Sequence, residues 1–184
     1  MSVDPNDIMR LIASLLAKTP SAPGTKWQDR VVLGCWAARY VPAAMTHLPG
    51  YPITNIGFSI PYSRQFLAVP NISFNLLLAA LVSPSGRRFI AQAQAQNRPI
   101  YAWTVNDEVG MDWCVRKGLD GVITDDPKKY IAFRDGWEEG STPLKWSWKT
   151  VMMYVRINVF AMMFGLIFWR RYGFGLKFEA PSKP

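Results

Sequence analysis

The residues best placed to do chemistry are polar and aromatic side chains that close two apolar runs in the second half of the chain. Trp103 and Asn106 close the run at 99–106, and Thr124 closes the run at 121–124. If both runs are parallel strands, their carboxyl ends meet at one edge of a sheet, where α/β proteins build ligand sites. An apolar wall, an amide and a hydroxyl would then be available to a substrate. We predict Trp103, Asn106 and Thr124 as substrate-binding residues, with core packing and turn formation as the alternative roles of Trp103 and Thr124.

Groups for acid–base or metal chemistry are sparse. His47 is the single histidine and precedes a turn, which favours a loop or helix-end role. Asp107 and Asp125 stand where helices are expected to begin, and capping of backbone N–H groups satisfies both without a metal. Cys35 and Cys114 are too few and too far apart for a disulfide framework or a zinc site, so we expect buried free thiols. We assign no catalytic residue and no metal ligand.

Strands alternating with helices must position these side chains. A helix is predicted to begin at Pro5 with Asp4 as its N-cap, and the stretch 75–82 is apolar and ambiguous between strand and helix. About four strands are expected, which indicates βαβ units and a parallel sheet that is either doubly wound or part of a barrel. Four parallel strands would leave two open edges. The predicted strands are 30–36, 53–60, 99–106 and 121–124, and the predicted helices are 5–19, 37–46, 86–95, 107–117 and one from 127.

The segment 100–127 carries a resemblance to a known family. Its residues Trp103-Thr104-Val105-Asn106 and Gly118-Leu119-Asp120-Gly121-Val122-Ile123-Thr124-Asp125 resemble the last two strand–helix units of the glycerophosphodiester phosphodiesterase (GDPD) family, with Pro127 one place later than usual. Upstream, DRVVLGCW (29–36) and ITNIGFSIPYSRQFL (53–67) are similar to the fungal branch that resembles phosphatidylglycerol-specific phospholipase C. The resemblance covers residues 4–130.

The resemblance implies the C-terminal half of a (β/α)₈ TIM barrel, running from its fourth helix through its eighth strand. The chain has 184 residues, fewer than the roughly 250 of a complete barrel. We therefore expect a partial barrel at 1–137, a linker at 138–150, a membrane-associated hydrophobic helix at 151–169 and a basic tail at 170–184.

The activity that the resemblance implies is hydrolysis of a phosphoric diester in glycerophospholipid metabolism. Relatives use a divalent cation, Mg²⁺ or Ca²⁺, with acid and base groups from a His-Arg-Gly motif, a Glu-x-Asp motif and a further histidine, and none of these motifs occurs here. We expect an N-terminally truncated enzyme that is inactive alone and whose substrate is a glycerophospholipid or glycerophosphodiester. The alternatives are a non-catalytic, membrane-tethered half-barrel remnant or interaction protein that associates through its open edges, and a different phosphate-handling barrel enzyme.

The end of the chain has the composition of a membrane-contacting segment. The net charge is +8, but residues 1–144 carry 14 basic and 12 acidic side chains, whereas residues 145–184 carry seven basic ones and only Glu179. The absence of a nucleic-acid-binding motif argues against nucleic acid as a partner. The run at 151–169 would span about 28 Å as a helix, although Arg156 and Asn158 weaken a crossing.

A spanning helix, a monotopic helix and a buried soluble helix all remain open for this segment. Trp, Lys and Arg on both sides favour membrane association. The N-terminus lacks the features of a secretory signal, so we expect the barrel to face the cytosol, at an endomembrane, a lipid droplet or the mitochondrial surface.

Overall fold

The computed structural model describes residues 4–172, so part of the expected basic tail, 173–184, lies outside the described residues. Five parallel strands form one sheet. The strands are β1 (Leu33–Cys35), β2 (Ile53–Gly57), β3 (Ile72–Leu77), β4 (Ile100–Trp103) and β5 (Gly121–Val122). The α-helices are α1 (Pro5–Lys18), α2 (Tyr40–His47), α3 (Ile60–Ser63), α4 (Leu78–Val82), α5 (Pro84–Gln94), α6 (Glu108–Arg116), α7 (Pro127–Asp135) and α8 (Trp148–Tyr172), and two 3₁₀ turns occupy Trp27–Asp29 and Arg64–Ala68.

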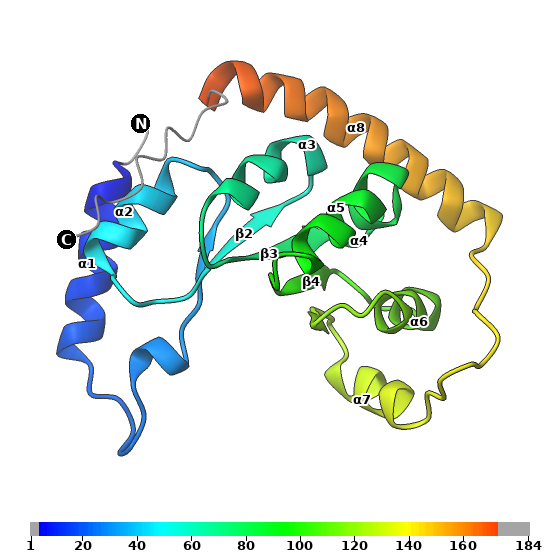
Figure 1. The fold of residues 1–184 in the computed structure, drawn as a ribbon, viewed down its shortest axis with the longest axis horizontal. Helices are drawn as coiled ribbons and strands as arrows, with labels where there is room; N and C mark the ends of the chain where they lie inside the picture. The colour runs from blue at the N-terminus through cyan, green and yellow to red at the C-terminus, as the bar shows by residue number, and fades with distance from the viewer. Residues whose placement is uncertain (1–3, 173–184) are drawn as a thin grey trace.

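The strand order decides between the two sheet types that the sequence left open. The strands pair in chain order, β1-β2-β3-β4-β5, and every pair is parallel. A doubly wound sheet needs a switch point where the order reverses, whereas right-handed crossovers between successive neighbours place the helices on one face, as in a barrel. In Figure 1 the elements accordingly form an open arc, with α1 and α2 at one end and α6 and α7 at the other.

The fifth strand comes from the stretch that was ambiguous in sequence. The expectation of about four strands was too low, because residues 75–82 divide into the end of β3 and the whole of α4. The first helix is confirmed: Asp4 accepts the backbone N–H of Asn6 at 2.8 Å, and Pro5 is the first helical residue. The helix predicted from residue 86 begins slightly earlier, at Pro84, with Ser83 as its N-cap.

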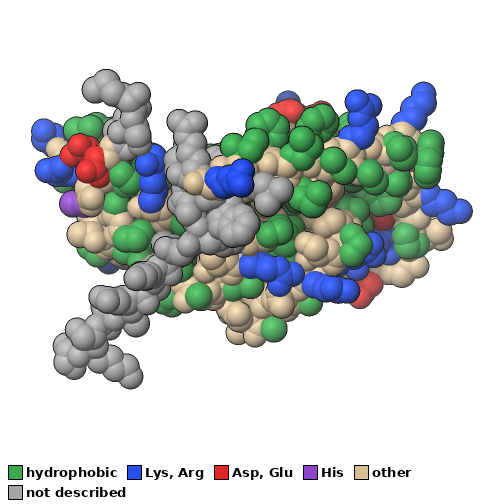
Figure 2. Space-filling model, turned by 90° about the horizontal axis from the view of Figure 1, so that it is seen from above, with side chains coloured by type: hydrophobic (Ala, Val, Ile, Leu, Met, Phe, Trp, Pro, Cys, Tyr) green, Lys and Arg blue, Asp and Glu red, His purple; other side chains and the backbone are tan. Residues whose placement is uncertain are grey.

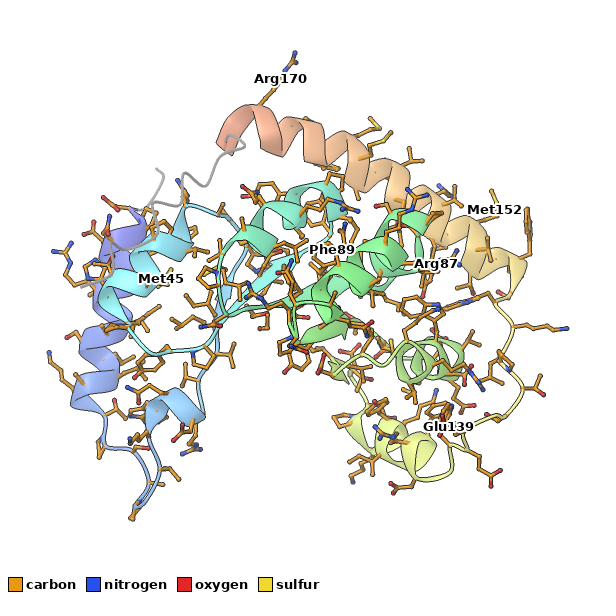
Figure 3. All side chains as sticks on the ribbon, viewed as in Figure 1. Met45, Arg87, Phe89, Glu139, Met152 and Arg170 are labelled. Atoms are coloured by element: carbon orange, nitrogen blue, oxygen red, sulfur yellow. The ribbon has the colours of Figure 1, made fainter. Side chains whose placement is uncertain are left out.

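One face of the sheet is covered by helices and forms the core. Phe74 and Leu76 of β3 are fully buried, and the Phe74 ring meets the ring of Phe89 from α5 edge-on at 4.8 Å. Figure 3 shows Phe89 directed from α5 toward the sheet. The opposite face, which would line the inside of a closed barrel, is partly open, since Trp36 keeps 49% and Ile123 46% of its surface exposed.

The segment before α8 is hydrogen-bonded to one buried carboxylate of α6. Asp112 of α6 is 3% exposed and accepts two hydrogen bonds from Arg116 Nε, at 2.8 and 2.9 Å. It also accepts the indole N–H of Trp137 at 2.9 Å and the backbone N–H of Leu144 at 3.1 Å. The linker expected at 138–150 therefore packs against α6 and ends earlier than expected, at the start of α8.

Helix α8 lies against the carboxyl ends of the strands and contacts α4 and α3 (Figure 1). Asn158 fastens it, because its side-chain amide donates to Ala79 O of α4 and to Tyr154 O, both at 2.8 Å. Tyr154 packs on Trp146, and burial is the main cause that raises the pKa of its phenol. Within residues 4–172, no helix combines the length and the apolar character needed to cross a bilayer, so the prediction of a transmembrane helix is not supported.

Candidate substrate site at the carboxyl ends of the strands

Asn106 and Thr124 come together where β4 and β5 end. The Thr124 hydroxyl donates to Asn106 Oδ1 at 3.0 Å, and the backbone N–H of Asp125 donates to the same oxygen at 3.0 Å. The Asn106 amide in turn donates to Asp125 Oδ2 at 2.6 Å. Because β4 and β5 are parallel neighbours, the segments that follow them leave the sheet side by side. We call Asn106, Thr124 and Asp125 the polar cluster.

The residues around the polar cluster show which carboxylates cap helices. Asp107 accepts the Gly110 N–H at 2.8 Å and so caps α6, as predicted. Asp126, rather than the predicted Asp125, caps α7 by accepting the Lys129 N–H at 3.0 Å. The Asp125 carboxylate instead accepts from the Asn106 amide. The Lys129 ammonium donates to Asn106 O at 3.2 Å. The cluster thus presents an amide, a hydroxyl, a carboxylate and a nearby cation on an exposed surface.

Trp103 points away from the polar cluster, toward the middle of the sheet. Its indole N–H donates to Asn75 O of β3 at 3.0 Å, and its ring meets Trp36 edge-on at 5.7 Å. It also lines a small apolar hollow with Leu77 and Phe160 of α8. The structure therefore joins Asn106 to Thr124 directly and places Trp103 in a separate, aromatic part of the same edge.

An apolar cavity lies next to this aromatic part. Its volume is about 500 Å³, it is partly open to solvent, and it is lined by the residues after β2, the start of α5 and the inner side of α8, including Phe58, Ile60, Asn158 and Ala161. Sequence analysis missed Phe58, although it stands at the carboxyl end of a predicted strand. Asn158 was noticed only as a weakness in a membrane helix, and its isolation in an apolar run was the indication that it needs a partner.

His47 cannot contribute to this edge of the sheet. It is the last residue of α2, which runs back from the carboxyl end of β1 toward the amino end of β2, and its Nε2 lies 3.2 Å from Asn6 Oδ1 of α1. The helix-end role predicted for His47 is confirmed. Across residues 4–172, no group of three or more His, Cys, Asp or Glu side chains is arranged to hold a metal ion.

The two cysteines are inert in the folded chain. Cys35 on β1 and Cys114 on α6 are both buried and unpaired, as predicted. Burial raises the pKa of the Cys35 thiol to about 11, and burial together with the Asp107 charge raises that of Cys114 to about 12. Both thiols therefore stay protonated near neutral pH, which excludes them as nucleophiles.

The fold is an α/β fold of barrel type, and the polar cluster lies at the carboxyl ends of its strands, the edge at which barrel proteins build ligand sites. Residues 6–129 match the glycerophosphoryl diester phosphodiesterase family. The chain belongs to this family. The motif residue Asp120 has a structural role here, since it accepts the Ile100 N–H at 2.7 Å and aligns the start of β4 with β5.

Two solved structures show a similar fold. A phosphodiesterase from Oleispira antarctica, in complex with the product sn-glycerol-3-phosphate, aligns with a TM-score of 0.58 at 14% identity, over 72% of this chain and 51% of that protein. A glycerophosphodiester phosphodiesterase from Parabacteroides distasonis aligns with a TM-score of 0.57 at 13% identity, over 73% of this chain and 54% of its own. The chain thus spans about half the length of these structures. No curated protein matches the sequence.

Proposed function

We propose that this chain supplies the C-terminal half of a phosphodiesterase barrel that hydrolyses the phosphoric diester of a glycerophospholipid. The observation that carries the proposal is the polar cluster at the carboxyl ends of β4 and β5, in a sheet whose strands follow the order of a barrel. The product bound to the Oleispira antarctica protein is sn-glycerol-3-phosphate, which supports a glycerol-type diester as the substrate class. Asn106 and Thr124 would hold substrate oxygens, and Trp103 would form the apolar wall.

The acid, the base and the cation ligands would come from a complementary half. A divalent cation, Mg²⁺ or Ca²⁺, is the general requirement of the family, and the described residues offer no three-ligand group for it. The open inner face supports this division, because Val32, Trp36 and Ile123 expose large apolar surfaces that a second half-barrel would cover. Similarity to the fungal branch makes phosphatidylglycerol the lipid that we propose.

Attachment at a membrane surface, with the barrel in the cytosol, is part of the same proposal. Helix α8 exposes apolar side chains on its outer side, among them Met152, Val159 and Met163. Residues 145–172 include five basic residues and no acidic one, a charge pattern suited to anionic head groups. We expect α8 to lie in the interface rather than to cross it.

Turnover by the purified chain, alone and with a complementary half, tests the proposal. We expect residues 1–184 alone to release no phosphomonoester from phosphatidylglycerol vesicles, with or without Mg²⁺. Addition of a half-barrel from a relative that carries the His-Arg-Gly and Glu-x-Asp motifs should produce release that EDTA abolishes. EDTA-sensitive turnover by the chain alone would contradict the division of the site between two halves.

The second candidate is a non-catalytic, membrane-tethered half-barrel that acts through its open edges. The exposed apolar residues of the inner face favour it as much as they favour a complementary half. The genomic sequence upstream of the codon for Met1 separates the two proposals. In-frame codons for His-Arg-Gly and Glu-x-Asp support the enzyme, whereas an in-frame stop codon directly upstream supports the remnant.

A further inference from the structure

The cavity under α8 is part of a longer apolar surface. The cavity of about 500 Å³ falls within the range of about 300–1,000 Å³ that ligand pockets occupy. Phe58 also lines two neighbouring hollows, one of which reaches Trp36 and the other Trp103. Ala161 likewise lines both the cavity and the hollow at Trp103. Apolar surface therefore continues from α8 to the end of β4, beside the predicted substrate edge.

Two of the polar side chains that line the cavity, Asn158 and Ser83, already have partners within the protein. The Asn158 amide donates to Ala79 O and Tyr154 O. The Ser83 hydroxyl donates to Ala80 O at 2.7 Å and accepts the Gly86 N–H at 3.0 Å. An apolar ligand can fill the cavity without breaking these hydrogen bonds, so neither Asn158 nor Ser83 would become an unpaired buried polar group.

The cavity opens toward the face of α8 that carries apolar and basic side chains. Met162 lines the cavity and is 63% exposed, so it stands at the boundary between the cavity and the surface. Figure 2 shows hydrophobic side chains gathered on this side of the molecule with Lys and Arg around them. Arg170 points away from the half-barrel in Figure 3. A ligand that enters here passes from a cationic surface into an apolar space.

The geometry points to a binding site for one acyl chain of an anionic glycerophospholipid, between α8 and the segments that follow β2 and β3. The chain would pass Met162 and Ala161 and lie against Phe58, and the head group would stay near the carboxyl ends of the strands. This inference rests on the proposed function and names how that site would recognise a lipid rather than a water-soluble diester. It assigns to α8 a part in substrate binding in addition to membrane contact.

Binding of a monomeric lipid tests the inference. The probe is lysophosphatidylglycerol with a brominated acyl chain, kept below its critical micelle concentration, and the signal is quenching of tryptophan fluorescence in the full chain. We expect saturable quenching at one lipid per protein, because Trp36 and Trp103 line the adjoining hollows. Each methylene removed from a buried part of the chain should weaken binding about fourfold. Glycerophosphoglycerol, which has no acyl chain, should not displace the probe.

Two matched pairs of variants locate the site. Ala161→Phe fills the cavity and should weaken binding at least tenfold, whereas Met163→Phe places the same ring on the exposed side of α8 and should change binding less than twofold. Met162→Gln and Met163→Gln provide a second pair that disturbs packing less, since both methionines are exposed. Unsaturable quenching, displacement by glycerophosphoglycerol, or equal effects within both pairs would overturn the inference. The binding assay needs no turnover, so a failed hydrolysis test with intact binding counts against the proposed function alone.

Discussion

Replacement of Asp112 by Asn tests how the linker is held against α6. The carboxylate accepts from Arg116 at both oxygens, from the Trp137 indole at Oδ1 and from the Leu144 backbone at Oδ2. Asparagine has nearly the same shape but keeps only one acceptor oxygen. Its NH₂ group must face either the Trp137 or the Leu144 N–H, so one donor is left opposite another donor.

The expected loss of stability follows from these contacts. A hydrogen bond to a charged group contributes about 1.5–3 kcal/mol, and breaking a buried ion pair by removing one charge costs about 3–5 kcal/mol. Because asparagine retains part of the network, we expect the free energy of unfolding to fall by about 3 kcal/mol. For a chain of this size, that corresponds to a melting temperature roughly 6–12 °C lower.

Thermal and urea unfolding, followed by circular dichroism, measure the effect. Glu139→Gln is the matched control, because it removes a negative charge from the same linker at an exposed position (Figure 3). Its effect should stay within about 0.5 kcal/mol. A loss below about 1 kcal/mol for Asp112→Asn, or an equal loss for the control, would show that the linker is not held by this carboxylate.

Three further outcomes follow from the structure. Burial alone would raise the pKa of Asp112, but the hydrogen bonds from Arg116, Trp137 and Leu144 outweigh burial and lower this pKa. In acid titrations, the difference in unfolding free energy between wild type and Asp112→Asn should therefore be constant above about pH 5 and shrink as the pH falls below about 4. Gly86→Ala should cost about 3 kcal/mol in urea unfolding, since the new Cβ would lie 2.2 Å from Ala80 O, whereas Gly136→Ala, with its nearest atom at 3.7 Å, should be nearly neutral. Cys35 and Cys114 should resist Ellman's reagent at pH 8 in the folded chain and both react in denaturant, and fast reaction without denaturant would contradict their burial.

The sequence predicted the strand–helix alternation well where capping residues mark the start of each helix. Asp4, Asp107 and the Asp125-Asp126-Pro127 run mark helix starts because side-chain caps act within three residues, which is a local interaction. The stretch 75–82 has no such mark, since β3 passes directly into α4 without a polar residue between them. Periodicity could not divide it, and the number of strands came out one too low.

The sequence predicted the part of the candidate site that depends on where the strands end, but not the part that depends on distant contacts. Asn106 and Thr124 meet because β4 and β5 are neighbours, and neighbouring parallel strands were part of the prediction. The direction of the Trp103 side chain depends on Asn75, whose strand was not recognised. The cavity depends on α8 returning across the sheet, a contact between segments more than 75 residues apart.

Asn158 shows how much such a contact changes the meaning of a residue. In sequence alone, an amide within an apolar run indicates a helix that inserts less favourably into a bilayer, because lipid offers the amide no hydrogen-bond partner. In the fold, the Asn158 amide donates to the Ala79 carbonyl of α4, so it has a partner outside its own helix. The polar residue therefore orients α8, turning its Asn158 side toward α4. Any lipid surface can meet only the remaining, exposed side, where Met152, Val159 and Met163 lie. The helix is held to α4 through Asn158, and the membrane contact that we propose would bring the cavity beneath α8 to the lipid surface.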